Sequence, residues 1–139
     1  MFEFKNFDYL TDGEIDLIIE NKIPANEEKG YVPTYKYIIT LHNSKYSIGK
    51  IDLRIGNNEN SYYGGNIGYE IYEDYRGNGY ASKACAIIKQ VATSHGMNKL
   101  IRTCEKAGLS LKEIVDLPSY NEMYQKGERQ KCIFEWNLK

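Results

Sequence analysis

Apolar and polar residues alternate along several stretches of the first half of the chain, and a two-residue period predicts strands. A first strand is expected over residues 2–7. Three more strands, joined by short turns, are expected to pair antiparallel, the last over residues 66–73. The apolar residues on one face of these three strands are Tyr37, Ile39 and Leu41, then Ile51, Leu53 and Ile55, then Ile67, Tyr69 and Ile71.

Two stretches favour a helix instead. Thr11 and Asp12 can cap a first helix that ends before Pro24 and whose apolar set is Ile15, Leu17, Ile18 and Ile19. A second helix has apolar residues three and four positions apart, and it is expected to end at His95 and Gly96. Its apolar stripe is Ala81, Ala84, Cys85, Ile88, Val91 and Ala92.

The remaining segments complete a mixed fold. Residues 25–34 are expected to form a loop, and residues 56–60 a hairpin connection. Residues 98–101 predict a strand parallel to the one over residues 66–73, because a helical crossover joins them. Residues 109–117 and 131–138 predict a last pair of strands. We therefore expect one domain over residues 1–139, of the α/β (α+β) class, with a mixed, mostly antiparallel sheet flanked by helices.

Composition narrows the range of functions. A net charge of −1 gives no basic face for nucleic acid, and no apolar run approaches the length of a membrane span. The N-terminal residues lack a secretion signal, so a cytoplasmic protein is expected. Three scattered cysteines without a CxxC pair favour free thiols, and His42 and His95 lie too far apart in sequence to suggest a metal site.

The segment Tyr-Arg-Gly-Asn-Gly-Tyr-Ala over residues 75–81 carries the candidate chemistry. Its glycines let the main chain approach a ligand closely, and the first N–H groups of the following helix lack internal partners. A diphosphate is a natural ligand of such a helix start, with Arg76 as an added charge. A purely structural turn would also explain the glycines. A Walker loop would need Gly-Lys-Ser/Thr, and a dinucleotide fingerprint would need glycine where Ser82 stands.

Together with Ile-Gly-Tyr-Glu-Ile over residues 67–71, this segment resembles the acetyl-CoA-binding motif of the GNAT N-acetyltransferase family. The family pattern Arg/Gln-x-x-Gly-x-Gly/Ala is matched by Arg76, Gly79 and Ala81, and residues 105–109 are similar to the Glu-Lys-x-Gly-Phe ending of the family's last helix. The resemblance implies acetyl-CoA as cosubstrate, a splayed sheet, and direct attack of an amine on the thioester. The cofactor contacts that it implies are Ile71, Tyr72, Arg76, Gly77, Asn78, Gly79, Tyr80, Ala81 and Ser82.

A base must take a proton from the amine. Glu70 is the first candidate because it lies on the strand that would border the thioester, and Asp52 on the neighbouring strand is the second. Glu70 is equally well explained as a solvated residue or as a partner of Arg54. For the acid that would protonate the leaving thiolate, the family's tyrosine is replaced by Cys104, and Tyr124 is a looser substitute.

The chain departs from the family near residues 101–104, where roughly ten residues, about 15 Å of helix, are missing. A shortened last helix is therefore expected over residues 102–107. Three hypotheses follow: an N-acetyltransferase for an amine of a small molecule or protein, a CoA-binding protein with weak or lost catalysis, or another α/β domain. An exposed strand edge would allow a homodimer. Loops over residues 25–34 and 118–130 are expected to shape the acceptor pocket, where charges such as Glu122 would favour a cationic acceptor or simply be solvated.

Overall fold

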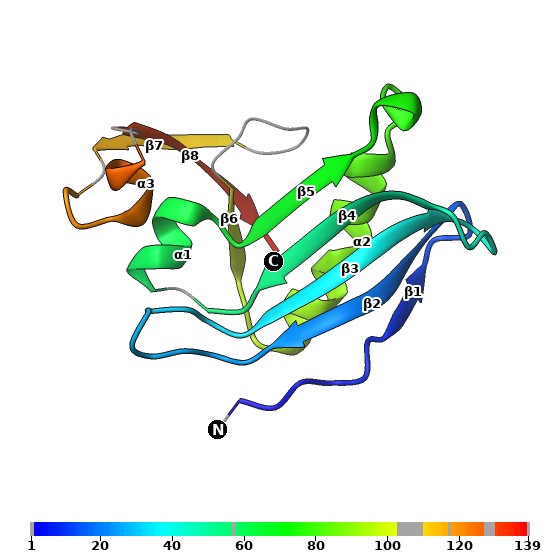
Figure 1. The fold of residues 1–139 in the computed structure, drawn as a ribbon, viewed down its shortest axis with the longest axis horizontal. Coiled ribbons are helices and arrows are strands. Elements are labelled where there is room, and N and C mark those ends of the chain that lie inside the picture. The colour runs from blue at the N-terminus through cyan, green and yellow to red at the C-terminus, as the bar shows by residue number, and fades with distance from the viewer. Residues whose placement is uncertain (1, 57, 103–109, 117, 127–129, 139) are drawn as a thin grey trace.

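The computed structural model describes residues 2–56, 58–102, 110–116, 118–126 and 130–138. Within these residues the chain forms two sheets and a few helices, of which one is long (Figure 1). In chain order the elements are β1 (Tyr9–Thr11), β2 (Ile15–Ile23), β3 (Thr34–Leu41), β4 (Ser47–Arg54), α1 (Glu59–Gly64), β5 (Ile67–Ile71), the 3-10 turn η1 (Glu73–Tyr75), α2 (Tyr80–Ser94), β6 (Lys99–Arg102), β7 (Ser110–Asp116), α3 (Glu122–Gln125) and β8 (Gln130–Asn137).

The larger sheet is antiparallel throughout and has the order β1-β2-β3-β4-β5, whereas the smaller sheet has the order β6-β8-β7. Tyr37 lies opposite Ile51, and Ile51 lies opposite Tyr69, so the predicted apolar faces of the three central strands coincide. Helix α2 lies across this apolar face (Figure 1). The mostly antiparallel α+β fold is therefore confirmed. None of the helices in the described residues is both long and apolar enough to span a membrane.

The N-terminal part differs from its prediction. Residues 15–23 form β2 rather than a helix, since its isoleucines are β-branched and the segment finds strand partners on both sides, β1 and β3. Asp12 caps a turn and not a helix: its Oδ1 accepts hydrogen bonds from the N–H groups of Glu14 and Ile15. Residues 2–7 are not a strand. Tyrosine hydroxyls hold this segment, because the Lys5 N–H donates to Tyr35 and Tyr37 donates to the Phe7 carbonyl.

The hairpin expected over residues 56–60 is also wrong, because helix α1 begins at Glu59. Asn58 and Ser61 cap it reciprocally: the side chain of each accepts a hydrogen bond from the main-chain N–H of the other. Helix α2 matches its prediction closely, and Gly96, with φ of +80°, follows its end. The predicted strand over residues 98–101 is present as β6, but its expected parallel pairing with β5 in one sheet is wrong: β6 pairs antiparallel with β8 in the smaller sheet.

The C-terminal strands follow the expected pairing. β7 and β8 are antiparallel, with Ile114 opposite Cys132. Arg102, expected to begin the short last helix, instead ends β6. Residues 103–107, which were expected to continue that helix, lie outside the described residues.

Candidate functional site

The turn between β5 and α2 depends on two glycines. Gly77 and Gly79 have φ of +84° and +77°, a region that residues with a side chain rarely adopt. A Cβ atom at either position would meet nothing within 4 Å, so backbone conformation and not crowding demands glycine there. Two side chains fix the rest of the turn. Arg76 Nε donates to the Ile71 carbonyl at 2.7 Å, and Asn78 Nδ2 donates to the Tyr75 carbonyl at 3.0 Å.

Helix α2 begins with a row of unused main-chain donors. Its first internal hydrogen bond runs from the Lys83 N–H to the Gly79 carbonyl at 3.1 Å, and Gly79 has no side chain to cap the preceding N–H groups. The N–H groups of residues 77–82 form no hydrogen bond with any residue in the described part of the chain. No acidic residue stands in the first turn of the helix. This turn therefore offers several donors and the positive end of a helix dipole to an anion.

A hollow of about 440 Å³ lies beside these donors. It extends from the end of β5 to the first turn of α2, which is the size and setting of a small-molecule site. Its lining includes most of the expected cofactor contacts, but not Tyr72 or Asn78. The lining residues are Tyr69, Glu70, Ile71, Tyr75, Arg76, Gly77, Gly79, Tyr80, Ala81 and Ser82.

Strand β5 is the edge of the larger sheet, so one of its sides is not paired within that sheet. The Tyr72 N–H donates to the Ile48 carbonyl at 2.9 Å, and the Tyr72 carbonyl accepts from the Tyr75 N–H. Main-chain groups alternate along a strand, so those of Ile71 point to the opposite, outer side. An extended ligand could therefore pair with the Ile71 N–H. The main-chain groups of Tyr72 are already hydrogen-bonded, so Tyr72 could contact a ligand through its half-buried side chain.

One buried asparagine joins the two sheets at the other end of β5. The Asn66 N–H donates to the Ile101 carbonyl at 2.6 Å, and Asn66 Oδ1 accepts from the Ile101 N–H at 2.8 Å. Asn66 Nδ2 donates to the carbonyls of Arg54 and Gly56 at 3.1 and 2.9 Å. From this junction β5 and β6 lead away in different directions (Figure 1), which gives the splayed arrangement that the family resemblance implies.

Both candidate bases lie on the face of the sheet that points away from α2. Glu70 is exposed, lies opposite Lys50, and lines the hollow beside α2. It does not pair with Arg54. The Arg54 guanidinium donates to the Gly65 carbonyl at 2.9 Å and lies 3.7 Å from the carboxylate of Asp52, which leaves Glu70 available.

The proposed acids are not placed by the structure. Tyr124 belongs to the short helix α3, but its side chain lies outside the part of the chain that the structure describes. Cys104 lies within residues 103–109, also outside the described residues.

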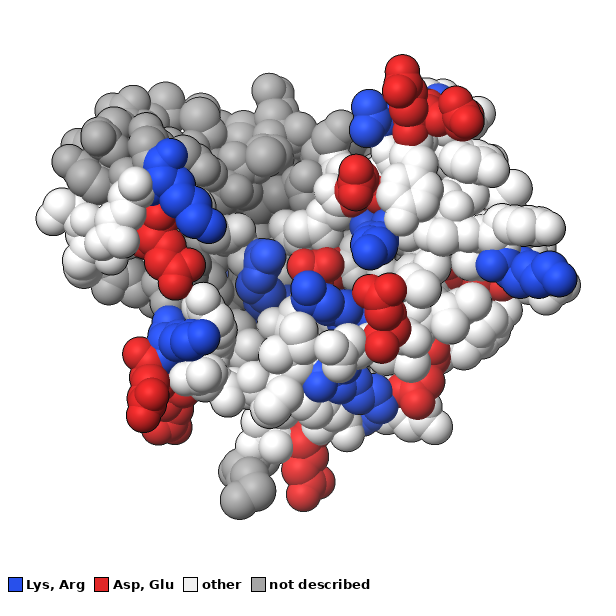
Figure 2. All heavy atoms as spheres, viewed as in Figure 1, with Lys and Arg blue, Asp and Glu red and all other residues white. Residues whose placement is uncertain are grey.

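A second hollow, of about 490 Å³, lies on the face opposite α2. Figure 2 looks onto this face, where side chains of both charges meet over the middle of the sheet. Both loops that were expected to shape an acceptor pocket contribute to it. The strand residues Lys36 and Arg54 and the α1 residues were missed, because only the fold brings them together. The lining comprises Ile23, Gly30, Tyr31, Val32, Thr34, Lys36, Asp52, Arg54, Asn58, Ser61, Gly64, Asn121, Glu122 and Met123.

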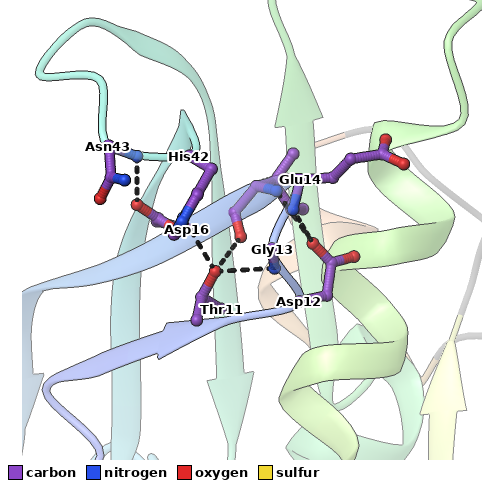
Figure 3. Close-up of polar contacts among 8 residues, drawn as sticks. Thr11, Asp12, Gly13, Glu14, Asp16, His42 and Asn43 are labelled. Carbon is purple, nitrogen blue, oxygen red and sulfur yellow. Dashed lines mark hydrogen bonds and ion pairs between the residues drawn. The ribbon is translucent and has the colours of Figure 1, made fainter.

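A third polar cluster, around Asp16 and His42, is structural (Figure 3). His42 Nδ1 lies 2.8 Å from Asp16 Oδ1 and 3.3 Å from the Thr11 hydroxyl, so one ring nitrogen makes both contacts. A nucleophilic triad needs both nitrogens, and this cluster lacks that arrangement. Burial would raise the pKa of Asp16, but hydrogen bonds from His42, Thr11 and the Asn43 N–H outweigh it and lower this pKa to about 2.

Comparison with known proteins agrees with this geometry. The family profile described as an acetyltransferase (GNAT) domain matches residues 3–110, which include both sides of the hollow beside α2. No match was found among curated proteins or among solved structures. With the matched region covering most of its length, the chain belongs to the GNAT family of acetyltransferases.

Proposed function

We propose that the protein transfers the acetyl group of acetyl-CoA to an amine, as a single acetyltransferase domain. The observation that carries the proposal is the row of unbonded N–H groups over residues 77–82 beside a hollow that also reaches Glu70. These donors would hold the diphosphate, with Arg76 adding charge at the entrance. The Ile71 N–H, on the outer edge of β5, would pair with the extended pantetheine arm.

In the reaction, the amine nitrogen forms a bond to the acetyl carbonyl carbon, and the bond from that carbon to sulfur breaks. Glu70 would accept the proton that the ammonium loses before attack, directly or through water. The second proton, which the nitrogen loses as the amide forms, balances the proton that the CoA thiolate takes up. The CoA sulfur leaves as a thiolate and takes up a proton, for which Tyr124 is a candidate donor.

Turnover and binding measured together test this proposal. We expect acetyl-CoA to bind by calorimetry and a panel of amines to release CoA thiol. Glu70→Gln should lower the turnover rate about 10²-fold, because a general base contributes at least that much, and leave the affinity for acetyl-CoA unchanged. Glu73→Gln is the matched control, since it removes the same charge from an exposed neighbour outside the hollow.

The outcomes separate the hypotheses. Binding without thiol release from any amine would leave a CoA-binding protein that lacks catalysis. If acetyl-CoA does not bind, the glycine turn is purely structural and the proposal fails. Equal loss of turnover in Glu70→Gln and Glu73→Gln would show that Glu70 is not the general base.

A further inference from the structure

The second hollow contains a lysine with no counter-charge. Lys36, on β3, is half-buried and lines this hollow, yet its ammonium has no ion pair or hydrogen bond within the described residues. Asp52 is its cross-strand neighbour, but their charged groups do not approach within 4.0 Å. Removing an ammonium from water is costly unless a negative group compensates it. A ligand with an anionic group would supply that compensation.

The other cation of the hollow is already engaged. Arg54 donates to the last carbonyls of α1 and approaches Asp52 at 3.7 Å. Glu122, at the opposite wall, accepts a hydrogen bond from the Tyr31 hydroxyl at 3.1 Å. Among the described residues, Lys36 is thus a cation of this hollow with no ion pair, and the ionic contact of Asp52 is the long one to Arg54.

These two residues lie close enough to hold one small molecule. Directly opposite residues of paired strands have Cβ atoms about 5 Å apart, and Lys36 and Asp52 are such a pair. The remaining wall offers apolar surface from Ile23, Val32 and Met123. A molecule with an ammonium group, a carboxylate and a short apolar body matches this lining.

The hollow and the proposed cofactor site have no lining residue in common, but the paired strands β4 and β5 connect them. Asp52 lies opposite Gly68, and Glu70 follows two residues later on the same face of β5. A Cβ atom at Gly68 would lie 3.7 Å from the Asp52 carboxylate, so the missing side chain leaves room above the strand for the Asp52 and Arg54 head groups. Asp52 and Glu70 are therefore diagonal neighbours on one face of β4 and β5, about 7–8 Å apart, so an amine bound at Asp52 can extend toward Glu70.

We propose that the acceptor is a free apolar amino acid, whose ammonium group binds Asp52 and whose carboxylate binds Lys36. This rests on the proposed function and names its substrate class. The amino nitrogen gains the acetyl group, its released proton goes to Glu70, and the CoA sulfur leaves. A polyamine would instead bring a second positive charge against Lys36, which the hollow disfavours.

Matched acceptors test the proposal. L-leucine, L-methionine and L-phenylalanine are each compared with the corresponding amide, in which the carboxylate is neutralised. We expect kcat/KM to be at least about tenfold higher for the acids, because the amides offer Lys36 a neutral carbonyl in place of a carboxylate. Lys36→Gln should abolish that preference without lowering the thermal unfolding midpoint. Lys45→Gln, on the exposed β3–β4 turn, is the control of equal charge and should keep the preference.

Binding of a product analogue can be measured without turnover, so it tests the Lys36 site independently of catalysis. In the presence of CoA, NMR should detect binding of N-acetyl-leucine but not of N-acetyl-leucinamide, and Lys36→Gln should remove that binding. If acids and amides are acetylated equally, or Lys36→Gln keeps the preference, the inference is wrong while the proposed function stands. If no amine is acetylated, the proposed function fails. In that case, Lys36-dependent binding of N-acetyl-leucine still supports the site, and absence of binding overturns it.

Discussion

At the scale of single residues, Asn66 controls a site that it does not line. Its amide is fully buried and connects β6 to the end of β4, so it fixes the point from which β5 and β6 separate. Apolar packing could join the two strands there, but it would not fix which residues meet. The position of the edge on which an acetyl donor would lie therefore depends on this asparagine, whose main chain and side chain both bind Ile101.

Removing this side chain should be costly. We expect Asn66→Ala to lower the free energy of unfolding by about 3 kcal/mol, since it leaves the Ile101 N–H and the Arg54 carbonyl without side-chain partners in the interior. The Gly56 carbonyl keeps its hydrogen bond from the Ser61 hydroxyl. Urea unfolding measures this loss. Asn98→Ala, the same change at an exposed side chain, should cost less than about 0.5 kcal/mol. Similar losses at both positions would contradict the role given to Asn66.

Sequence reasoning reached the residues of the turn but not this junction. Gly77, Gly79 and Arg76 stand next to one another, so a local pattern identifies them. Asn66 acts through Ile101, which is 35 residues away, and Lys36 meets Asp52 only through strand register. Nothing in the sequence around either residue signals such partners.

At the scale of elements, the start of α2 has properties that favour a ligand over the stability of the helix. A capping side chain and an acidic first turn would both stabilise the helix, and α2 has neither. The same donors and dipole are what a bound diphosphate needs. Stability and cofactor binding should therefore respond in opposite directions to a negative charge placed there.

Ser82→Asp tests this opposition at the third residue of the helix. The carboxylate should raise the free energy of unfolding by about 0.5 kcal/mol through the helix dipole. It should also weaken binding of acetyl-CoA by roughly tenfold or more, through repulsion of the diphosphate at close range. Ser82→Asn provides the neutral control for calorimetry and thermal unfolding. Unchanged affinity in the aspartate variant would place the diphosphate elsewhere.

In both wrongly predicted N-terminal segments, partners elsewhere in the chain decide the structure. The isoleucines of β2 fit a helical stripe as well as a strand, and pairing with β1 and β3 decides the outcome. Residues 2–7 show strand alternation, but their main chain is held by the Tyr35 and Tyr37 hydroxyls instead of a neighbouring strand. Elements with a strong local signal, such as α2 and the three central strands, were predicted correctly.

Across the molecule, two titrating side chains lie at opposite ends of strand β3: His95 contacts Tyr35 near its start, and Asp16 contacts His42 just after its end. Burial and the Lys5 charge lower the pKa of His95, whose Nε2 lies 2.7 Å from the Tyr35 hydroxyl. The same hydroxyl accepts a hydrogen bond from the Lys5 N–H at 2.9 Å. At the opposite end, the buried carboxylate of Asp16 has its pKa lowered from 3.8 to about 2.

Acid should therefore destabilise the fold in two steps. Both groups bind protons more readily in the unfolded chain, so stability falls as the pH is lowered through each unfolded-state value. His95 acts below its ordinary pKa of 6.5, and Asp16 acts between 3.8 and about 2. Unfolding free energies measured across this range should lose the upper step in His95→Gln. The lower step should shrink in Asp16→Asn, and what is left of it belongs to Asp12. Burial would raise the pKa of Asp12, but hydrogen bonds from the Ile15 and Glu14 N–H groups outweigh it and lower this pKa. A wild-type profile that stays flat below pH 6.5 would contradict both assignments.

In the proposed complex, main-chain N–H groups at the start of α2 hold the diphosphate of acetyl-CoA. Contradiction of this contact would remove the basis of the proposed function. The most direct measurement is an NMR titration that follows the amide resonances of residues 77–82 as acetyl-CoA is added. We predict that these resonances shift together and saturate, with smaller changes along β5. Resonances that stay in place while acetyl-CoA binds, or no binding at millimolar concentration, would contradict this contact.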